Sequence, residues 1–194
     1  PSEDPITMGA HAADNPAWVR EVLDFWFAEL GESGWFSRDA GIDERIRARF
    51  LALHERLSAD EGGSVAGARP LLAAVIVLDQ FSRNLFRGSA RAFASDALAR
   101  HLARRAIADG LDSEMEPEER YFLYLPFEHS EDPADQALAV DLIARLDCEE
   151  WTKYALAHQA LIDRFGRFPH RNAVLGRQSS AEEIAAMKQP MGSF

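Results

Sequence analysis

The sequence contains one cysteine and no apolar run as long as a membrane-spanning helix. A single cysteine, Cys148, excludes an intramolecular disulfide, which fits the reducing cytoplasm. A bilayer-spanning helix needs about 20 consecutive apolar residues, so we expect no membrane partner. The first residues are acidic and lack the apolar core of a secretory signal. Together these absences predict a cytoplasmic protein.

An excess of positive charge is also missing. The chain carries 21 Lys and Arg residues against 32 Asp and Glu residues, for a net charge of -11. Binding to a phosphate backbone needs a basic face, so we expect no nucleic acid partner. The 194 residues, 47% of them hydrophobic and 27% charged, suffice for one compact domain with a real core.

Strand signals are absent, because no segment alternates polar and apolar residues and no Asn-Gly hairpin occurs. Helix starts are marked instead by Asn15-Pro16, Asp132-Pro133 and the capping pair Ser180 and Glu183. We predict seven or eight helices in antiparallel pairs and no sheet. A poorly ordered leader is expected over residues 1–14, with Met8 as an alternative start, followed by one all-helical domain over residues 15–194.

A nearly continuous apolar run covers residues 71–78. A buried strand would explain it, but the alanines and the helical neighbours favour a buried helix from about Ala68 to Arg83. Asp79 directly follows this run and lies four residues before Arg83, so the two can pair on one helix face. Asp79, Arg83 and Asn84 therefore either close the helix end or form one wall of a polar pocket.

The basic loop, residues 165–177, concentrates side chains capable of chemistry. It contains Arg167, Arg171 and Arg177 as permanent cations, together with His170 and Asn172. The arginines can bind acids such as Asp79 or Glu128 across the core and so stabilise the fold. They can equally bind the carboxylate or phosphate of a ligand, because the guanidinium fork suits both.

Two further groups contain histidine. Glu128 and His129 are adjacent at a predicted helix end, where they suit proton transfer or a simple interaction of His129 with the helix dipole. His158 lies among alanines and leucines, which favours a hydrogen-bonded core histidine. A metal site needs three or four ligands, and no His-Glu-x-x-His or Cys-x-x-Cys pattern occurs, so we predict no metal. The sequence identifies no cofactor.

Five stretches carry a resemblance to a known family. They are residues 25–27 (Phe-Trp-Phe), 35–36 (Trp-Phe), 78–88, 122–131 and 164–172. This pattern resembles a bacterial family of unknown function, DUF924, from about Val19 onward. The resemblance implies an all-helical, tetratricopeptide-like fold and supplies no activity. Ser82 departs from the proline expected there, which affects only the local turn.

Three functions remain open. The first is a binding module with a pocket for a small anionic ligand or a peptide carboxylate. The candidate ligand-binding residues are Asp79, Arg83, Asn84, His158, Arg167, Arg171 and Asn172. The second is a hydrolase in which Glu128, His129 and His170 act as acid-base groups. The third is a scaffold for a protein partner, with purely structural polar clusters.

Overall fold

The computed structural model describes residues 15–192 and residue 194, and every regular element in that part of the chain is a helix. The predicted all-α class is confirmed. The leader predicted over residues 1–14, including Met8, lies outside the described residues. Within the described part of the chain, no helix is both long and apolar enough to span a membrane.

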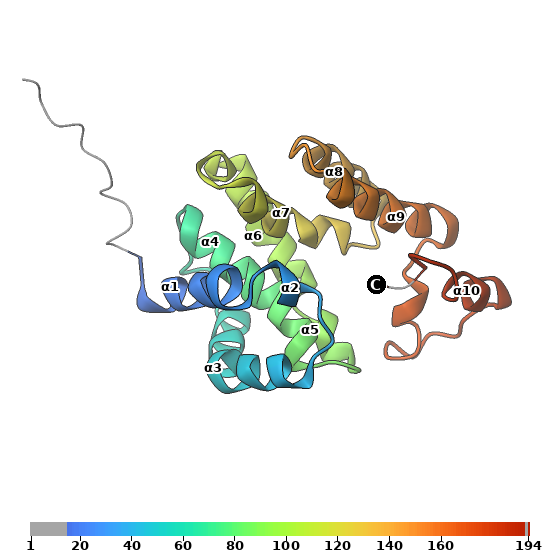
Figure 1. Ribbon diagram of the computed structural model, residues 1–194, viewed down its shortest axis with the longest axis horizontal. Helices are drawn as coiled ribbons and strands as arrows, with labels where there is room; N and C mark the ends of the chain where they lie inside the picture. Colours follow the sequence, from blue (N-terminus) through green and yellow to red (C-terminus); the bar gives the residue numbers. More distant parts are fainter. Residues whose placement is uncertain (1–14, 193) are drawn as a thin grey trace, which may run out of the picture.

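The first half of the chain folds around one buried helical stretch (Figure 1). Its elements are α1 (Ala17–Leu23), η1 (Asp24–Leu30), α2 (Glu32–Trp35), α3 (Ala40–Ala59), α4 (Ala68–Val75), η2 (Ile76–Phe81) and α5 (Ser82–Leu85). The stretch α4–η2–α5 is continuous, as predicted for the helix from Ala68 to Arg83, and the alternative of a strand over residues 71–78 is wrong.

The second half adds helices that neighbour one another in chain order. They are η3 (Ala90–Phe93), α6 (Asp96–Ala108), η4 (Leu111–Glu114), α7 (Pro117–Glu128), α8 (Pro133–Ala144), α9 (Glu149–Phe165), η5 (Pro169–Arg171) and α10 (Ala181–Ala186). Helix α8 packs against both α7 and α9, and short turns join the three (Figure 1). The tetratricopeptide-like stacking stays a prediction.

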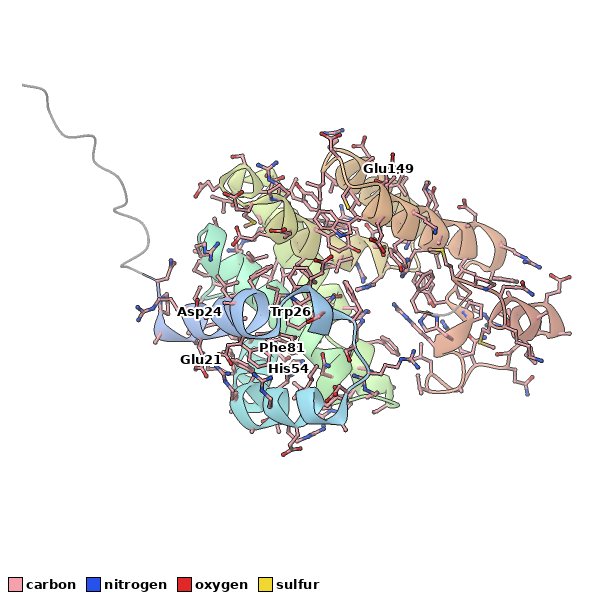
Figure 2. All side chains as sticks on the ribbon, in the orientation of Figure 1. Glu21, Asp24, Trp26, His54, Phe81 and Glu149 are labelled. Atoms are coloured by element: carbon pink, nitrogen blue, oxygen red, sulfur yellow. The ribbon has the colours of Figure 1, made fainter. Side chains whose placement is uncertain are left out.

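Aromatic packing fixes η2 inside the first half of the fold. Trp26 and Phe81 are 1% and 0% exposed, and their ring centroids lie 5.6 Å apart. Phe81 also contacts Phe50 of α3, at 4.8 Å between centroids. Figure 2 shows Trp26 and Phe81 between the first helices and α3. Because Phe81 is held from two sides, the polar residues just before it have a fixed position.

The stretch Ile76–Phe81 is a π-helix and not the α-helix that the sequence predicts. A π turn closes hydrogen bonds from residue i to i+5, and such turns occur frequently at functional sites. All six residues of η2 are buried, including Asp79 and Gln80. A carboxylate that is removed from water needs charged or hydrogen-bonding partners, and the surrounding helices supply them.

Candidate functional site

Polar side chains from five parts of the chain meet at η2. We call them the central polar cluster, and its members are Asp79, Arg83, Asp96, Glu128, His129, His158, His170 and Arg171. The rings of His129 and His158 lie 6.0 Å apart. The basic loop reaches the helix ends here, because Arg171 lies 3.6 Å from Asp96 and donates to the His129 carbonyl oxygen at 3.0 Å.

Asp79 is the fully buried carboxylate at the base of the cluster. Its Oδ1 lies 2.8 Å from His129 Nδ1 and 3.3 Å from Arg83 Nη1, and its Oδ2 accepts from Gln80 Nε2 at 2.7 Å. Burial alone would raise the pKa of Asp79, but the charge of Arg83 and the pairing with His129 lower it below its ordinary value. Asp79 is therefore ionised at neutral pH, and the predicted pairing with Arg83 is present.

Asp96, in the first turn of α6, links the two arginines of the cluster. Its carboxylate accepts hydrogen bonds from Arg83 Nη1 at 3.0 Å and from Arg83 Nη2 at 3.2 Å. Asp96 Oδ2 also lies 3.6 Å from Arg171 Nη1. In the sequence, Asp96 lies in the first turn of a helix, where the helix dipole favours an acid. An acid at a helix start needs no further explanation. Nothing in the sequence therefore linked Asp96 with Arg83, 13 residues before it, or with Arg171 in the basic loop.

His129 terminates α7 and faces the cluster. An ionised carboxylate can only accept a hydrogen bond, so the contact with Asp79 places the imidazole proton on Nδ1 and leaves Nε2 as the free nitrogen. Burial lowers the pKa of His129 more than the charge of Asp79 raises it. The ring is therefore neutral at pH 7, and its side chain is 14% exposed, which gives solvent access to the cluster.

A second histidine–carboxylate pair lies beside the first. His158 Nδ1 is 3.0 Å from Glu128 Oε1 and 2.9 Å from the Tyr154 carbonyl oxygen. Both neighbours are acceptors, so Nδ1 carries the proton and Nε2 carries the free lone pair in the neutral ring. The ring of Phe194 stacks on His158 at 3.7 Å and covers one of its faces. His158 is thus hydrogen-bonded and buried, as expected for a core histidine.

Arg171 and His170 bring incompletely partnered groups into the cluster. Arg171 is 7% exposed, and its Nη2 donates to the His129 carbonyl oxygen at 3.0 Å. Its Nε and His170 Nδ1 are buried and have no hydrogen-bond partner among the described residues. Burial, and then the charge of Arg83, lower the pKa of Arg171 to about 10. Burial, and then the charge of Arg171, lower the pKa of His170 to about 3.

Three predicted ligand-binding residues have partners outside the cluster. Asn84 donates to Asp43 of α3 at 2.7 Å. Arg167 binds both oxygens of Glu183, at 2.7 and 3.0 Å. Asn172 is fully buried, donates to Ser179 at 3.0 Å and accepts from Arg177. These residues shape the basic loop and its surroundings, and their hydrogen bonds are used within the protein.

Glu131, just after the end of α7, forms hydrogen bonds with the basic loop. It accepts from Arg177 at 2.8 and 2.9 Å and from the backbone N–H of Phe168 at 2.8 Å. The loop arginines therefore bind acids, as one interpretation of the sequence expected, although the acids are Glu183, Glu131 and Asp96 and not Asp79 or Glu128. Only Arg171 points into the central polar cluster.

The cluster offers donors and acceptors for a polar ligand. The imidazoles of His129 and His158 hold their Nδ1–H groups against acceptors and leave Nε2 free, and a buried guanidinium presents an unused Nε–H. Within residues 15–192 and 194, no group of three or more His, Cys, Asp and Glu side chains could hold a metal ion. The arrangement can bind an anion through Arg171 and can move a proton through either imidazole.

A model of one protein family matches most of this chain. Residues 22–191 match the family described as "Bacterial protein of unknown function (DUF924)", and the chain belongs to that family. A solved protein of unknown function, ATU0120 from Agrobacterium tumefaciens, is 39% identical. The similarity covers 90% of this chain and 98% of that one, with a TM-score of 0.84. No functionally curated protein matches the chain.

Proposed function

We propose that this protein is a helical binding module whose central polar cluster holds a small carboxylate or phosphate. The observation that carries this proposal is the state of Arg171, a buried cation whose Nε has no partner among the described residues. A buried polar group without a partner is costly, so a ligand that accepts from Nε would be stabilised there. The single cysteine, Cys148, supports a cytoplasmic ligand.

The two arginines of the cluster differ in a way that supports an anion at Arg171. Burial lowers the pKa of Arg83, but Asp79 and Asp96 outweigh it and raise the pKa above its ordinary value. The pKa of Arg171 is lowered to about 10, because burial and Arg83 outweigh its acids. The protein's own carboxylates therefore satisfy Arg83, while Arg171 keeps a positive charge that an external anion can balance.

Thermal unfolding tests this proposal with inorganic phosphate, acetate, succinate and citrate as probes. A ligand at a hundred times its dissociation constant adds about 2.7 kcal/mol to the free energy of unfolding. We expect at least one of these anions to raise the unfolding temperature of the wild-type protein. Arg171→Lys should abolish the rise, because lysine retains the charge and loses the planar fork with its Nε–H.

Arg167→Lys is the matched control, since it makes the same substitution in the same loop at a residue bound to Glu183. Each variant is compared with its own ligand-free form, so a lower intrinsic stability does not obscure the result. The proposal is contradicted if no anion shifts the wild-type protein. It is equally contradicted if Arg171→Lys keeps the full shift.

A second candidate function is acid-base catalysis, such as hydrolysis, at the same cluster. The observation that favours it is the pair of imidazoles whose Nδ1–H groups are each held by a carboxylate, Asp79 or Glu128. This arrangement orients the free Nε2 of His129 as a general base. His170 is less suited to act as a general acid than the sequence suggested, because a pKa of about 3 leaves its ring neutral at pH 7.

Hydrolysis of p-nitrophenyl acetate and p-nitrophenyl phosphate tests this second function. If the wild-type protein turns over either compound, His129→Gln should lower kcat by about 10²–10⁴-fold, the usual contribution of a general base. His101→Gln, at an exposed histidine of α6, is the control. Equal rates in both variants would mean that the imidazoles of the cluster serve binding alone.

A further inference from the structure

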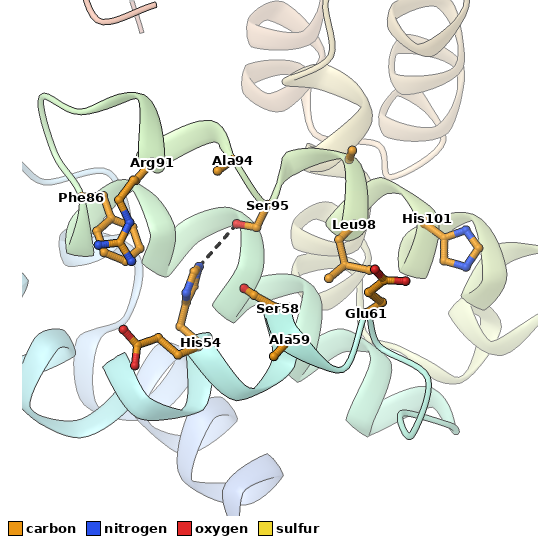
Figure 3. Close-up of a pocket in the computed structure, with 12 residues that line it drawn as sticks. His54, Ser58, Ala59, Glu61, Phe86, Arg91, Ala94, Ser95, Leu98 and His101 are labelled. Atoms are coloured by element: carbon orange, nitrogen blue, oxygen red, sulfur yellow. Dashed lines mark hydrogen bonds between the residues drawn. The ribbon is translucent and has the colours of Figure 1, made fainter.

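A second group of polar side chains surrounds a cleft outside the central polar cluster. The cleft has a volume of about 870 Å³ and lies between α3 and the η3–α6 segment (Figure 3). We call it the α3–α6 cleft. Its polar lining includes His54, Glu55, Ser58, Glu61 and Arg91. The sequence analysis assigned no role to any of these residues.

His54 projects from α3 into the cleft and is only 6% exposed (Figure 3). The hydroxyls of Ser82 and Ser95 lie 2.7 and 2.6 Å from the Leu78 carbonyl oxygen and 2.7 Å from each other, so both can donate their protons within this group. In that arrangement His54 Nε2 donates to Ser82 Oγ at 2.7 Å. Its Nδ1 is then an acceptor, buried and without a partner among the described residues. A ligand donor would satisfy it.

The protonation state of His54 agrees with this assignment. Burial, and then the positive charge of Arg91, lower the pKa of the imidazole. The ring is therefore neutral at pH 7, and Nδ1 keeps its lone pair. Beside it, Ser58 Oγ is a second buried polar atom without a partner in the part of the chain that the structure describes. Both atoms line the same cleft.

Two carboxylates add negative charge to the rim of the cleft. Glu55 and Glu61 are exposed, and neither forms an ion pair or side-chain hydrogen bond with another described residue. Arg91 forms no ion pair with either carboxylate in the described part of the chain, and its guanidinium lies 3.9 Å from the ring centroid of Phe86. Figure 3 shows Arg91 and Phe86 at one end of the cleft and Glu61 at the other, with His54 between them.

We propose that the α3–α6 cleft binds a small organic cation of the amine or guanidine class. The cationic N–H groups donate to the Glu61 and Glu55 carboxylates, and a neutral or cationic N–H donates to His54 Nδ1. Hydrogen bonds between charged groups are stronger than neutral ones, and they give this ligand its selectivity over anions. The apolar chain that joins the two cationic ends of such a ligand faces the Phe86 ring, which also lines the cleft.

Isothermal titration calorimetry tests the proposal with agmatine as the cationic probe and glutarate as an anionic probe. We expect agmatine to bind and glutarate not to bind. The double variant Glu55→Gln/Glu61→Gln should weaken agmatine binding by roughly tenfold or more, because it removes two charged acceptors. Glu44→Gln is the matched control, since Glu44 lies on the same helix, is 75% exposed in its side chain and does not line the cleft.

His54→Phe separates the buried acceptor from the charged rim. Phenylalanine retains a ring against Phe86 but has no lone pair, so agmatine binding should again fall by roughly tenfold, with folding checked by circular dichroism. Arg171→Lys should bind agmatine normally, because this cleft is separate from the anion site. The proposal is overturned if agmatine does not bind, if glutarate binds in preference, or if Glu55→Gln/Glu61→Gln binds as tightly as Glu44→Gln.

Discussion

Asp79→Asn is expected to lower the free energy of unfolding by about 3–5 kcal/mol, the usual cost of breaking a buried ion pair by removing one partner. Asp79 is fully buried and contacts both His129 and Arg83, at 2.8 and 3.3 Å. Asparagine leaves the charge of Arg83 to Asp96 alone and offers His129 a neutral amide oxygen in place of a carboxylate. Urea denaturation followed by circular dichroism measures the change.

Asp141→Asn is the matched control, because Asp141 pairs with Arg145 at the same i, i+4 spacing as Asp79 with Arg83. The Asp141 side chain is 57% exposed, so its removal should cost only about 0.3–0.5 kcal/mol. The two substitutions remove the same chemical group from the same helical spacing. If their costs are similar, Asp79 does not stabilise the cluster in the way described.

The effect of Asp79 should also depend on pH. The folded protein holds the pKa of Asp79 below the ordinary value of about 4. Its contribution to stability is therefore fully present above about pH 4 and is lost as the pH falls from there toward the folded-state pKa. The difference between wild type and Asp79→Asn should shrink on acidification below about pH 4 and stay constant between pH 5 and 7. Denaturation curves across this range provide the measurement.

Phe168→Ala is expected to cost about 3–5 kcal/mol, as large-to-small changes of a buried aromatic residue do. Phe168 is 0% exposed and packs with Leu161 and Ile162 in a small second core. Its ring also lies 5.6 Å from that of His158 and 4.6 Å from the guanidinium of Arg171. The cavity should therefore loosen the basic loop and weaken anion binding together with stability.

Phe36→Ala is the control for this second substitution, since Phe36 is 61% exposed. Its ring stacks on Phe122 at 6.1 Å between centroids, so the loss of this surface contact should cost about 0.5–1.5 kcal/mol, well below the cost at Phe168. Thermal unfolding of both variants, with and without phosphate, gives stability and ligand response together. A mild effect of Phe168→Ala would contradict the role of the second core in positioning Arg171.

The helical class and most helix positions could be predicted from the sequence, because caps and apolar periodicity are local signals. Pro117, Asp132-Pro133 and Ser180 with Glu183 each mark a helix start that the structure contains. The π-helix at Ile76–Phe81 could not be predicted, since its apolar residues suit either kind of helix. Phe81, the last residue of this π-helix, packs against Phe50 and Trp26. These are tertiary contacts, which a local sequence pattern does not reveal.

The candidate site could be predicted only in part, because pairing across the fold is not a local property. The spacing of Asp79 and Arg83 indicated their contact, and adjacency indicated Glu128 with His129. Which acid each loop arginine binds depends on helices that are distant in the sequence. Asp96 was therefore not predicted as a partner of Arg171. Arg167 was predicted to bind a ligand, although it binds Glu183. His54 follows Phe50 and Ile46 along the buried stripe of α3, and a polar residue on such a stripe was the available signal for the second cleft.

The most direct test of the central claim is nitrogen-15 NMR of the histidine side chains at pH 7, with and without inorganic phosphate. We predict that His129 and His158 carry a proton on Nδ1, and that phosphate changes the signals of these two rings but not those of the exposed His101. This result would place a bound anion inside the central polar cluster. Rings protonated at Nε2, or a phosphate response that is equal at His101, would contradict it.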